Sequence, residues 1–143
     1  MNEIVLSLLA WLTVNSDYRL IEHPPRVTVV AEAADVVEYA RTIGLDGPHG
    51  IAGMVYDCRR ERVMLTRSQA ARITAGQDRM LSALVYELAH HAQCLAAKRR
   101  GAALGQCRME DEAYELQFKF LRQTGHEKDA DDLKGLVADR RRC

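Results

Sequence analysis

The feature that most constrains the fold of this 143-residue chain is segment 77–98, where apolar residues recur at the spacing of an α-helix. Its apolar positions include Met80, Leu81, Leu84, Leu88 and Leu95. Glu87, His90 and His91 nevertheless stand in the middle of the segment, where unpaired polar groups are costly. We therefore expect a long, mostly buried helix whose polar side chains are paired or form a site.

Length and composition indicate one globular domain, residues 1–143, because a chain of this size can bury its own core. A hydrophobic content of 48% with 28% charged residues is ordinary for such a domain. The formal net charge of +0 provides no general positive field, which argues against a nucleic-acid partner.

The apolar start of the chain predicts an amphipathic helix rather than a signal peptide. Its apolar residues at 4, 8, 11 and 12 share one helical face, and the segment lacks a basic beginning and a small-residue cleavage site. It is also too short to span a bilayer. We therefore expect a cytoplasmic protein with no membrane partner.

The other periodicities predict an α+β fold with a small sheet packed on a helical layer. The motif Thr74-Ala-Gly-Gln77 has the form of a capping box and would begin the long helix, while 47–50 reads as a loop. Strands 51–56 and 62–66 are expected to form a hairpin. The full set comprises strands at 27–31, 51–56 and 62–66 and helices at 2–14, 32–43, 77–98, 108–123 and 127–139.

The four cysteines are too few and too scattered to form a disulfide framework, and no C-x-x-C motif occurs. They stand at Cys58, Cys94, Cys107 and Cys143. Free buried thiols are the expected state. Cys94 and Cys107 flank the turn between two predicted helices and could pair in an oxidising compartment.

Helical spacing gathers several chemically active side chains on one face of helix 77–98, since residues three and four apart are neighbours. That face carries Tyr86, Glu87, His90 and Cys94. The next predicted helix presents Glu110, 20 residues after His90, whose carboxylate could complete a three-ligand zinc site. The alternative is a hydrogen-bonded surface between two helices, with Glu110 favoured only by the dipole of its own helix.

Two stretches together carry a family resemblance: L-V-Y-E-L-A-H-H-A-Q at 84–93 and E-D-E-A-Y-E-L-Q at 110–117. They resemble small uncharacterised bacterial proteins of the HExxH zinc metallopeptidase type, built on a minimal gluzincin core. Those proteins usually show H-E-x-x-H-H-x-Q, followed by a helix with a glutamate three residues before an Ala-Tyr pair. The resemblance covers most of the chain and is specific only within 84–121. It implies a zincin-like fold.

By position, the resemblance implies that Glu87 is the general base, His90 the second zinc ligand and Glu110 the third. Glu112 is a weaker candidate for the third ligand, because it falls one residue before the Ala113-Tyr114 pair. The glutamate beside the first ligand of such a site takes a proton from the metal-bound water.

Tyr86 departs from the pattern, because it stands where the first histidine ligand is expected. Tyrosine binds zinc as the phenolate, which is costly at neutral pH since its reference pKa is about 10. Two other residues could repair the site. His91 stands four residues after the glutamate, and a Cys94 thiolate with His90 and Glu110 would make a sensible zinc set.

The sequence therefore predicts a zincin-like protein with an impaired metal site, non-catalytic or weakly active, in which zinc binding is weak or absent. Its partner would be a peptide or protein segment, lying along the edge of the small sheet as the resemblance implies. The alternative is an active zinc-dependent peptidase with a rearranged ligand set, in which zinc polarises a carbonyl and Glu87 acts on water.

Overall fold

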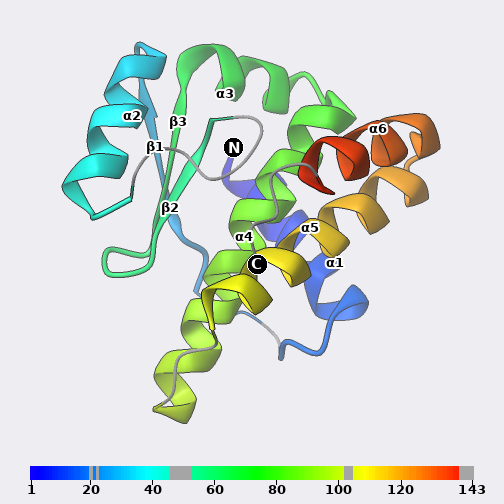
Figure 1. Ribbon diagram of the computed structural model, residues 1–143. Coiled ribbons are helices and arrows are strands. Elements are labelled where there is room, and N and C mark those ends of the chain that lie inside the picture. The colour runs from blue at the N-terminus through cyan, green and yellow to red at the C-terminus, as the bar shows by residue number, and fades with distance from the viewer. Residues whose placement is uncertain (20, 22, 46–52, 102–104, 139–143) are drawn as a thin grey trace.

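The computed structural model describes residues 1–19, 21, 23–45, 53–101 and 105–138 (Figure 1). Those residues form six helices and three strands, which confirms the α+β prediction. No described helix is both long and apolar enough to cross a membrane. The elements are α1 (Asn2–Asn15), β1 (Arg26–Val30), α2 (Ala33–Thr42), β2 (Val55–Asp57), β3 (Arg62–Thr66), α3 (Arg67–Thr74), α4 (Asp78–Arg100), α5 (Gln106–Gln123) and α6 (Glu127–Ala138).

The sheet has the strand order β1-β3-β2, with β1 parallel and β2 antiparallel to the central β3. The predicted hairpin is therefore confirmed as β2 and β3, in a register that pairs Tyr56 with Val63. The predicted loop 47–50 and the first residues of predicted strand 51–56 lie outside the described residues. Because β2 has one strand partner among the described residues, it forms an edge of the sheet.

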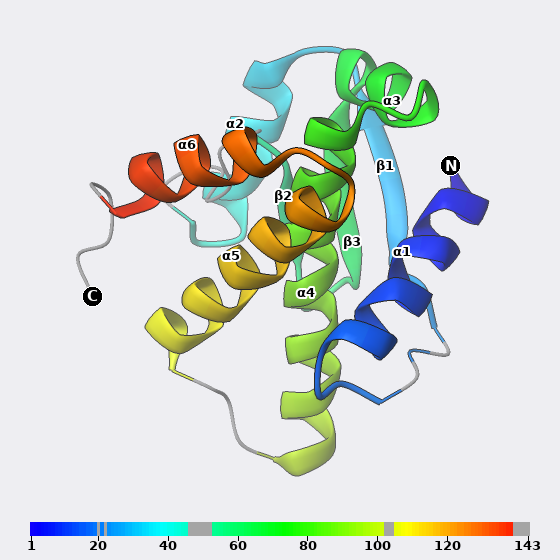
Figure 2. The ribbon, with the colours of Figure 1, turned by 90° about the vertical axis from the view of Figure 1, so that its right-hand side faces the viewer.

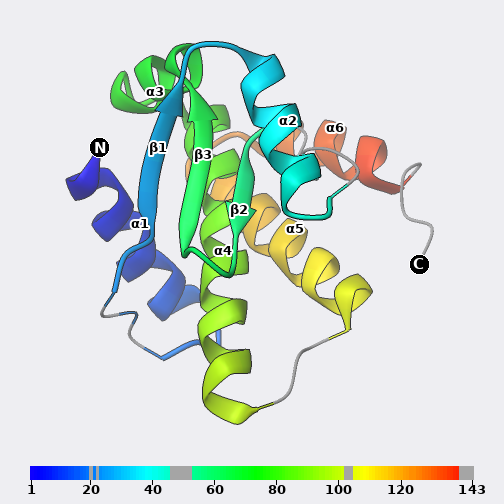
Figure 3. The same cartoon turned by 90° about the vertical axis from the view of Figure 1, so that its left-hand side faces the viewer.

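Helices cover both faces of this sheet (Figure 3). The residues of β3 alternate between the two faces. Val63 and Leu65 belong to the main core that the sheet shares with α4. Met64 packs on the opposite side with residues of α2. A strand covered on both faces has no need of the polar side that a half-exposed strand shows.

The helical layer is built around α4, with α1 and α5 on its flanks and α6 against α5 (Figure 2). The buried face of α1 consists of Val5, Leu8, Leu9 and Leu12. Trp11 of α1 meets Phe120 of α5 edge to face, with ring centroids 5.2 Å apart, and donates a hydrogen bond of 2.9 Å to Gln123. The first helix is thus fixed to a helix more than a hundred residues later in the chain.

The predicted capping box at Thr74–Gln77 is wrong, and the same pattern is used one helix earlier. Thr66 and Gln69 form a reciprocal capping box that begins α3, a helix that the periodicity did not predict. Helix α4 instead starts at Asp78, and the Gln77 side chain makes no capping hydrogen bond. The sequence contains T-x-x-Q twice, and the Thr66 copy lies where β3 ends in extended backbone, as a capping residue requires.

Candidate functional site

Helix α4 places the predicted site residues in the centre of the molecule. It ends at Gly101, whose φ of 66° is a left-handed conformation that glycine adopts without strain. Three basic residues occupy its last turn, where they complement the helix dipole. The middle of the helix is buried almost all round, so its polar side chains need partners there.

Tyr86 lies 1% exposed, and its hydroxyl donates a hydrogen bond to Glu110 Oε2. Its ring contacts those of His90 and Tyr114, each with centroids 4.7 Å away. Burial first, and then the charges of Glu110 and Glu87, hold the pKa of Tyr86 far above its ordinary value. The side chain is therefore a neutral phenol that donates a proton to a hydrogen bond, not the phenolate that zinc would require.

His90 and Glu110 meet as the two helix motifs predict. Glu110 lies in the first turns of α5, and its Oε1 is 3.6 Å from His90 Nε2. The two contacts of Glu110 come from opposite ends of its carboxylate, Oε1 toward the imidazole and Oε2 toward the phenol. Tyr86, His90 and Glu110 thus form one contiguous group between α4 and α5.

The orientation of His90 is fixed by Gln93, three residues further along α4. Gln93 donates through Nε2 to Met109 O at 2.9 Å and to Glu112 Oε2 at 3.1 Å. Its Oε1 therefore faces His90 Nδ1, at 2.8 Å, and accepts a hydrogen bond from it. His90 then presents Nε2 toward Glu110. An imidazole held in this way resembles a metal ligand with its supporting hydrogen bond.

Glu112 lies on the far side of Gln93 from this group. Besides the bond from Gln93, its Oε2 accepts one from the Tyr18 hydroxyl. The carboxylate that faces His90 is that of Glu110, so the structure separates the two candidate third ligands. Glu112 instead ties the segment after α1 to the paired helices α4 and α5.

Glu87 is 3% exposed and lies beside the same group. Its backbone contact is with Tyr56 of β2, whose hydrogen bond favours the charged carboxylate. Burial first, and the charge of Glu110 second, outweigh that bond and raise the pKa of Glu87 to about 8. Glu87 is therefore mostly protonated at neutral pH, a state in which a carboxyl donates a hydrogen bond rather than accepting a proton.

His91 is fully buried, and both of its ring nitrogens are engaged. Nε2 lies 2.7 Å from His23 O, a carbonyl that can only accept, so Nε2 carries the proton. Nδ1 then accepts from the Tyr56 hydroxyl at 2.8 Å. Burial lowers the pKa of His91, which keeps the ring neutral. His91 therefore joins β2 and the segment that precedes β1 to α4, on the other side from the Tyr86 group.

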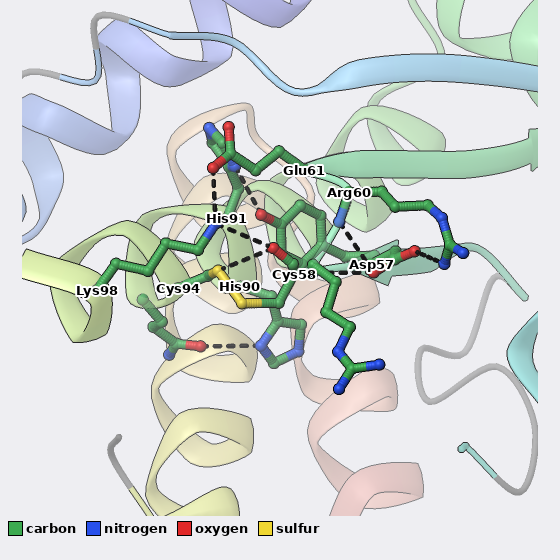
Figure 4. Close-up of a disulfide and its surroundings, with 11 residues drawn as sticks. Asp57, Cys58, Arg60, Glu61, His90, His91, Cys94 and Lys98 are labelled. Carbon is green, nitrogen blue, oxygen red and sulfur yellow. Dashed lines mark hydrogen bonds and ion pairs between the residues drawn. A yellow bond between two sulfur atoms is a disulfide. The ribbon is translucent and has the colours of Figure 1, made fainter. Parts of the chain in front are cut away.

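Cys94 forms a disulfide with Cys58, with 5.8 Å between their Cα atoms (Figure 4). The expectation of free thiols is therefore wrong for Cys94, and so is its pairing with Cys107. Spacing alone did not single out Cys58, because the packing of the β2–β3 turn on α4 is tertiary. Lys98 supports the same junction by donating to Cys58 O at 3.2 Å and to Glu61 at 2.7 Å. Disulfides persist in oxidising compartments, so the cytoplasmic location stays a prediction.

A cavity of about 170 Å³ lies between β2, α4 and α5, and several of these groups line it. Its polar wall comprises Glu87, His90 and Glu110, and the disulfide closes another side. Met54, Val55 and Met109 supply apolar surface. A mostly apolar hollow with a few convergent polar groups is the usual form of a ligand site.

The residues in this cavity do not fit the zinc ion that the resemblance implies. A catalytic zinc site needs three protein ligands and an open position. His90 and Glu110 supply two, and the third position holds the neutral phenol of Tyr86. With the Cys58–Cys94 disulfide closed, the described residues include no group of three or more histidine, cysteine, aspartate or glutamate side chains that could hold a metal ion. We therefore assign no zinc-dependent step to these residues.

Comparison with known proteins identifies a family without a described activity. A family model described as Domain of unknown function (DUF6647) matches residues 1–138, and the chain belongs to that family. No curated protein and no solved structure matches the chain. The α+β fold and its mostly apolar cavity with a few polar groups are therefore what define the protein structurally.

Proposed function

We propose that this chain is a zincin-like protein with an impaired metal site, acting as a non-catalytic or weakly active homologue of metallopeptidases. The observation that carries the proposal is the hydrogen bond from Tyr86 to Glu110. It joins the position of the expected first ligand to that of the expected third. A neutral phenol there holds α4 and α5 together without a metal ion.

The surrounding groups support a scaffold of this kind. His90 carries a supporting hydrogen bond on Nδ1 and turns Nε2 toward Glu110, as a ligand pair would be arranged. Glu87 follows Tyr86 directly and is buried beside the pair. These are the parts of a metallopeptidase site with one ligand replaced.

The ligand class that this cavity favours is an extended peptide or protein segment. Among the described residues β2 is an edge strand, and an edge can pair with a further strand through backbone hydrogen bonds. Val55 and Tyr56 of β2 line the cavity, so a peptide paired with β2 would lie over Glu87. A protonated Glu87 can donate a hydrogen bond to a peptide carbonyl, which is a binding role rather than that of a general base.

The second candidate, an active peptidase with rearranged ligands, has less support. With the disulfide closed, Cys94 has no thiolate to offer. Both nitrogens of His91 are engaged on the side of β1 and β2. The two residues that could have replaced the missing histidine are thus committed to structural contacts.

The decisive experiment is the zinc content of the oxidised protein beside a Tyr86→His variant, each exposed to zinc and then desalted. We expect no stoichiometric zinc in the unmodified chain and one ion per chain in Tyr86→His. Glu115→His is the matched control, because it adds a histidine on the exposed face of α5. It should bind no more zinc than the unmodified chain.

Stoichiometric zinc in the unmodified oxidised chain would refute the impaired site. Failure of a folded Tyr86→His variant to bind zinc would refute the zincin-like scaffold. If Tyr86→His binds zinc, a peptidase assay on that variant tests whether Glu87 can again act on a metal-bound water.

A further inference from the structure

The disulfide is part of the wall of the cavity that contains His90 and Glu110. Cys58 is an exposed residue in the β2–β3 turn, whereas Cys94 is 3% exposed on α4 (Figure 4). Both cysteines border the cavity together with His90 and Glu110. Four residues whose side chains can bind metal ions therefore line one cavity, and two of them are joined by the disulfide.

We propose that reduction of this disulfide creates a zinc site formed by Cys58, Cys94 and His90, with Glu110 as the fourth ligand. Cys94 follows His90 by four residues, so the two side chains lie one helical turn apart on the same face. The disulfide already holds Cys58 next to Cys94. Two thiolates, an imidazole and a carboxylate are a ligand set that suits tetrahedral zinc.

Gln93 prepares His90 for this role. Because its Oε1 accepts a hydrogen bond from Nδ1, Nε2 is the ring nitrogen that faces Glu110. Loss of such a supporting contact typically weakens metal affinity by about 10–100-fold. The set of ligands is thus positioned by contacts that exist before any metal binds.

The reducing step requires a dithiol reductant of the thioredoxin class. Its thiolate attacks Sγ of the exposed Cys58, the Sγ–Sγ bond breaks, and its electron pair leaves with Cys94 as a thiolate. The second thiol of the reductant then displaces Cys58, so two protein thiols form while the reductant becomes a disulfide. Lys98, whose ammonium group lies 3.2 Å from Cys58 O, provides positive charge that favours thiolates here.

This site shares His90 and Glu110 with the proposed function but does not rest on it, since it needs neither a zincin-like scaffold nor a histidine at position 86. The Tyr86→His experiment is done on the oxidised protein and the present one on the reduced protein. The two proposals can therefore fail separately.

The test uses a Cys107→Ser, Cys143→Ser background, so that the thiols of Cys58 and Cys94 are the only ones in the chain. The protein is stripped of metal and titrated with Zn²⁺ and with Co²⁺, once oxidised and once reduced with a phosphine. We expect one ion per chain after reduction, with thiolate-to-cobalt charge-transfer absorption and the visible bands of tetrahedral cobalt. The oxidised form should bind at least about 100-fold more weakly, more than the loss of a supporting contact would cost.

In the same background, Cys58→Ser and Cys94→Ser each remove one of the two thiolate ligands. Neither variant should give the charge-transfer absorption expected for two thiolates, and each should bind Zn²⁺ at least about 100-fold more weakly. Gln93→Leu should weaken it by about 10–100-fold. His126→Gln is the control, because His126 pairs with Asp78 and Asp129 away from the cavity, and it should change nothing.

Circular dichroism of the reduced, metal-free protein keeps the result interpretable. If that form is unfolded, Zn²⁺ should restore the fold, since binding to the native state alone stabilises it. The proposal is overturned if a folded reduced protein binds no metal, or if Zn²⁺ fails to refold an unfolded one. It is also overturned if binding persists unchanged in both cysteine variants.

Discussion

Replacing Glu87 with glutamine should stabilise the protein at neutral and alkaline pH. Glu87 is buried, and its pKa is raised from 4.5 to about 8 by burial and then by the charge of Glu110. At about 1.4 kcal/mol for each pH unit, that interval corresponds to about 5 kcal/mol. Glutamine has nearly the same shape, keeps an oxygen for the Tyr56 backbone contact and carries no charge to desolvate.

The sign of the pH dependence follows from which state releases its proton first. Below pH 4.5 the carboxyl is protonated in the folded and unfolded states, and Glu87 carries no penalty. As the pH rises above 4.5, the unfolded chain loses this proton while the folded protein keeps it until about pH 8. The unfolded state therefore binds fewer protons across this interval, and the free energy of unfolding falls as pH rises.

The assay is urea denaturation of the unmodified chain and Glu87→Gln at a series of pH values from about 4.5 to about 9. At each pH, the free energy of unfolding of the unmodified chain is subtracted from that of Glu87→Gln. This difference should be about 5 kcal/mol larger at the alkaline end of the series than at the acid end. A cost of the new amide that does not depend on pH shifts this difference equally at every pH. The change of the difference with pH is therefore the quantity that tests the argument. Glu115→Gln, an exposed residue of α5, should leave the curve within about 0.5 kcal/mol. A difference that does not change with pH would refute the argument.

Three further predictions concern neighbouring contacts. Tyr86→Phe should lower the free energy of unfolding by about 1.5–3 kcal/mol, the range for a hydrogen bond to a charged group, and a double-mutant cycle with Glu110→Gln should assign that loss to the pair. Cys58→Ser should cost about 4 kcal/mol by loop-closure entropy over the sequence separation of 36, and denaturation in a reducing buffer should give the same loss for the unmodified chain. The lowered pKa of His91 means that the unfolded chain is protonated first, so stability should fall as pH drops below about 6.5. His91→Gln should remove that acid-side loss, and an unchanged acid limb would contradict the lowered pKa of His91.

Local sequence patterns predicted most of the elements, because helix and strand spacing is visible within a few turns. They failed where a residue's role depends on a distant segment. Met64 would interrupt the polar side of a strand with one exposed face, and the packing of α2 on that side of the sheet explains it. The two T-x-x-Q motifs are equivalent as local signals, and the end of β3 selects the first.

In the candidate site, too, local spacing predicted some contacts and missed those that depend on distant segments. Helical spacing was sufficient to place Tyr86, Glu87 and His90 together, and the second motif supplied Glu110. The partner of Cys94 could not be read from spacing, because Cys58 approaches it from another element. The environment of Glu87 was likewise hidden, since burial in the folded protein, rather than the residue type, raises its pKa.

The attachment of α1 to α5 has a consequence for folding during synthesis. The Trp11–Gln123 contact spans 112 residues, and Lys119 and Gln123 also bond to Asn15 at the end of α1. At about 5–20 residues per second, on the order of 5–20 s separate the synthesis of these partners. During that interval the apolar face of α1 emerges from the ribosome without the helix that later covers one of its sides. The nascent chain should therefore depend on chaperones that shield apolar segments until α5 has been made.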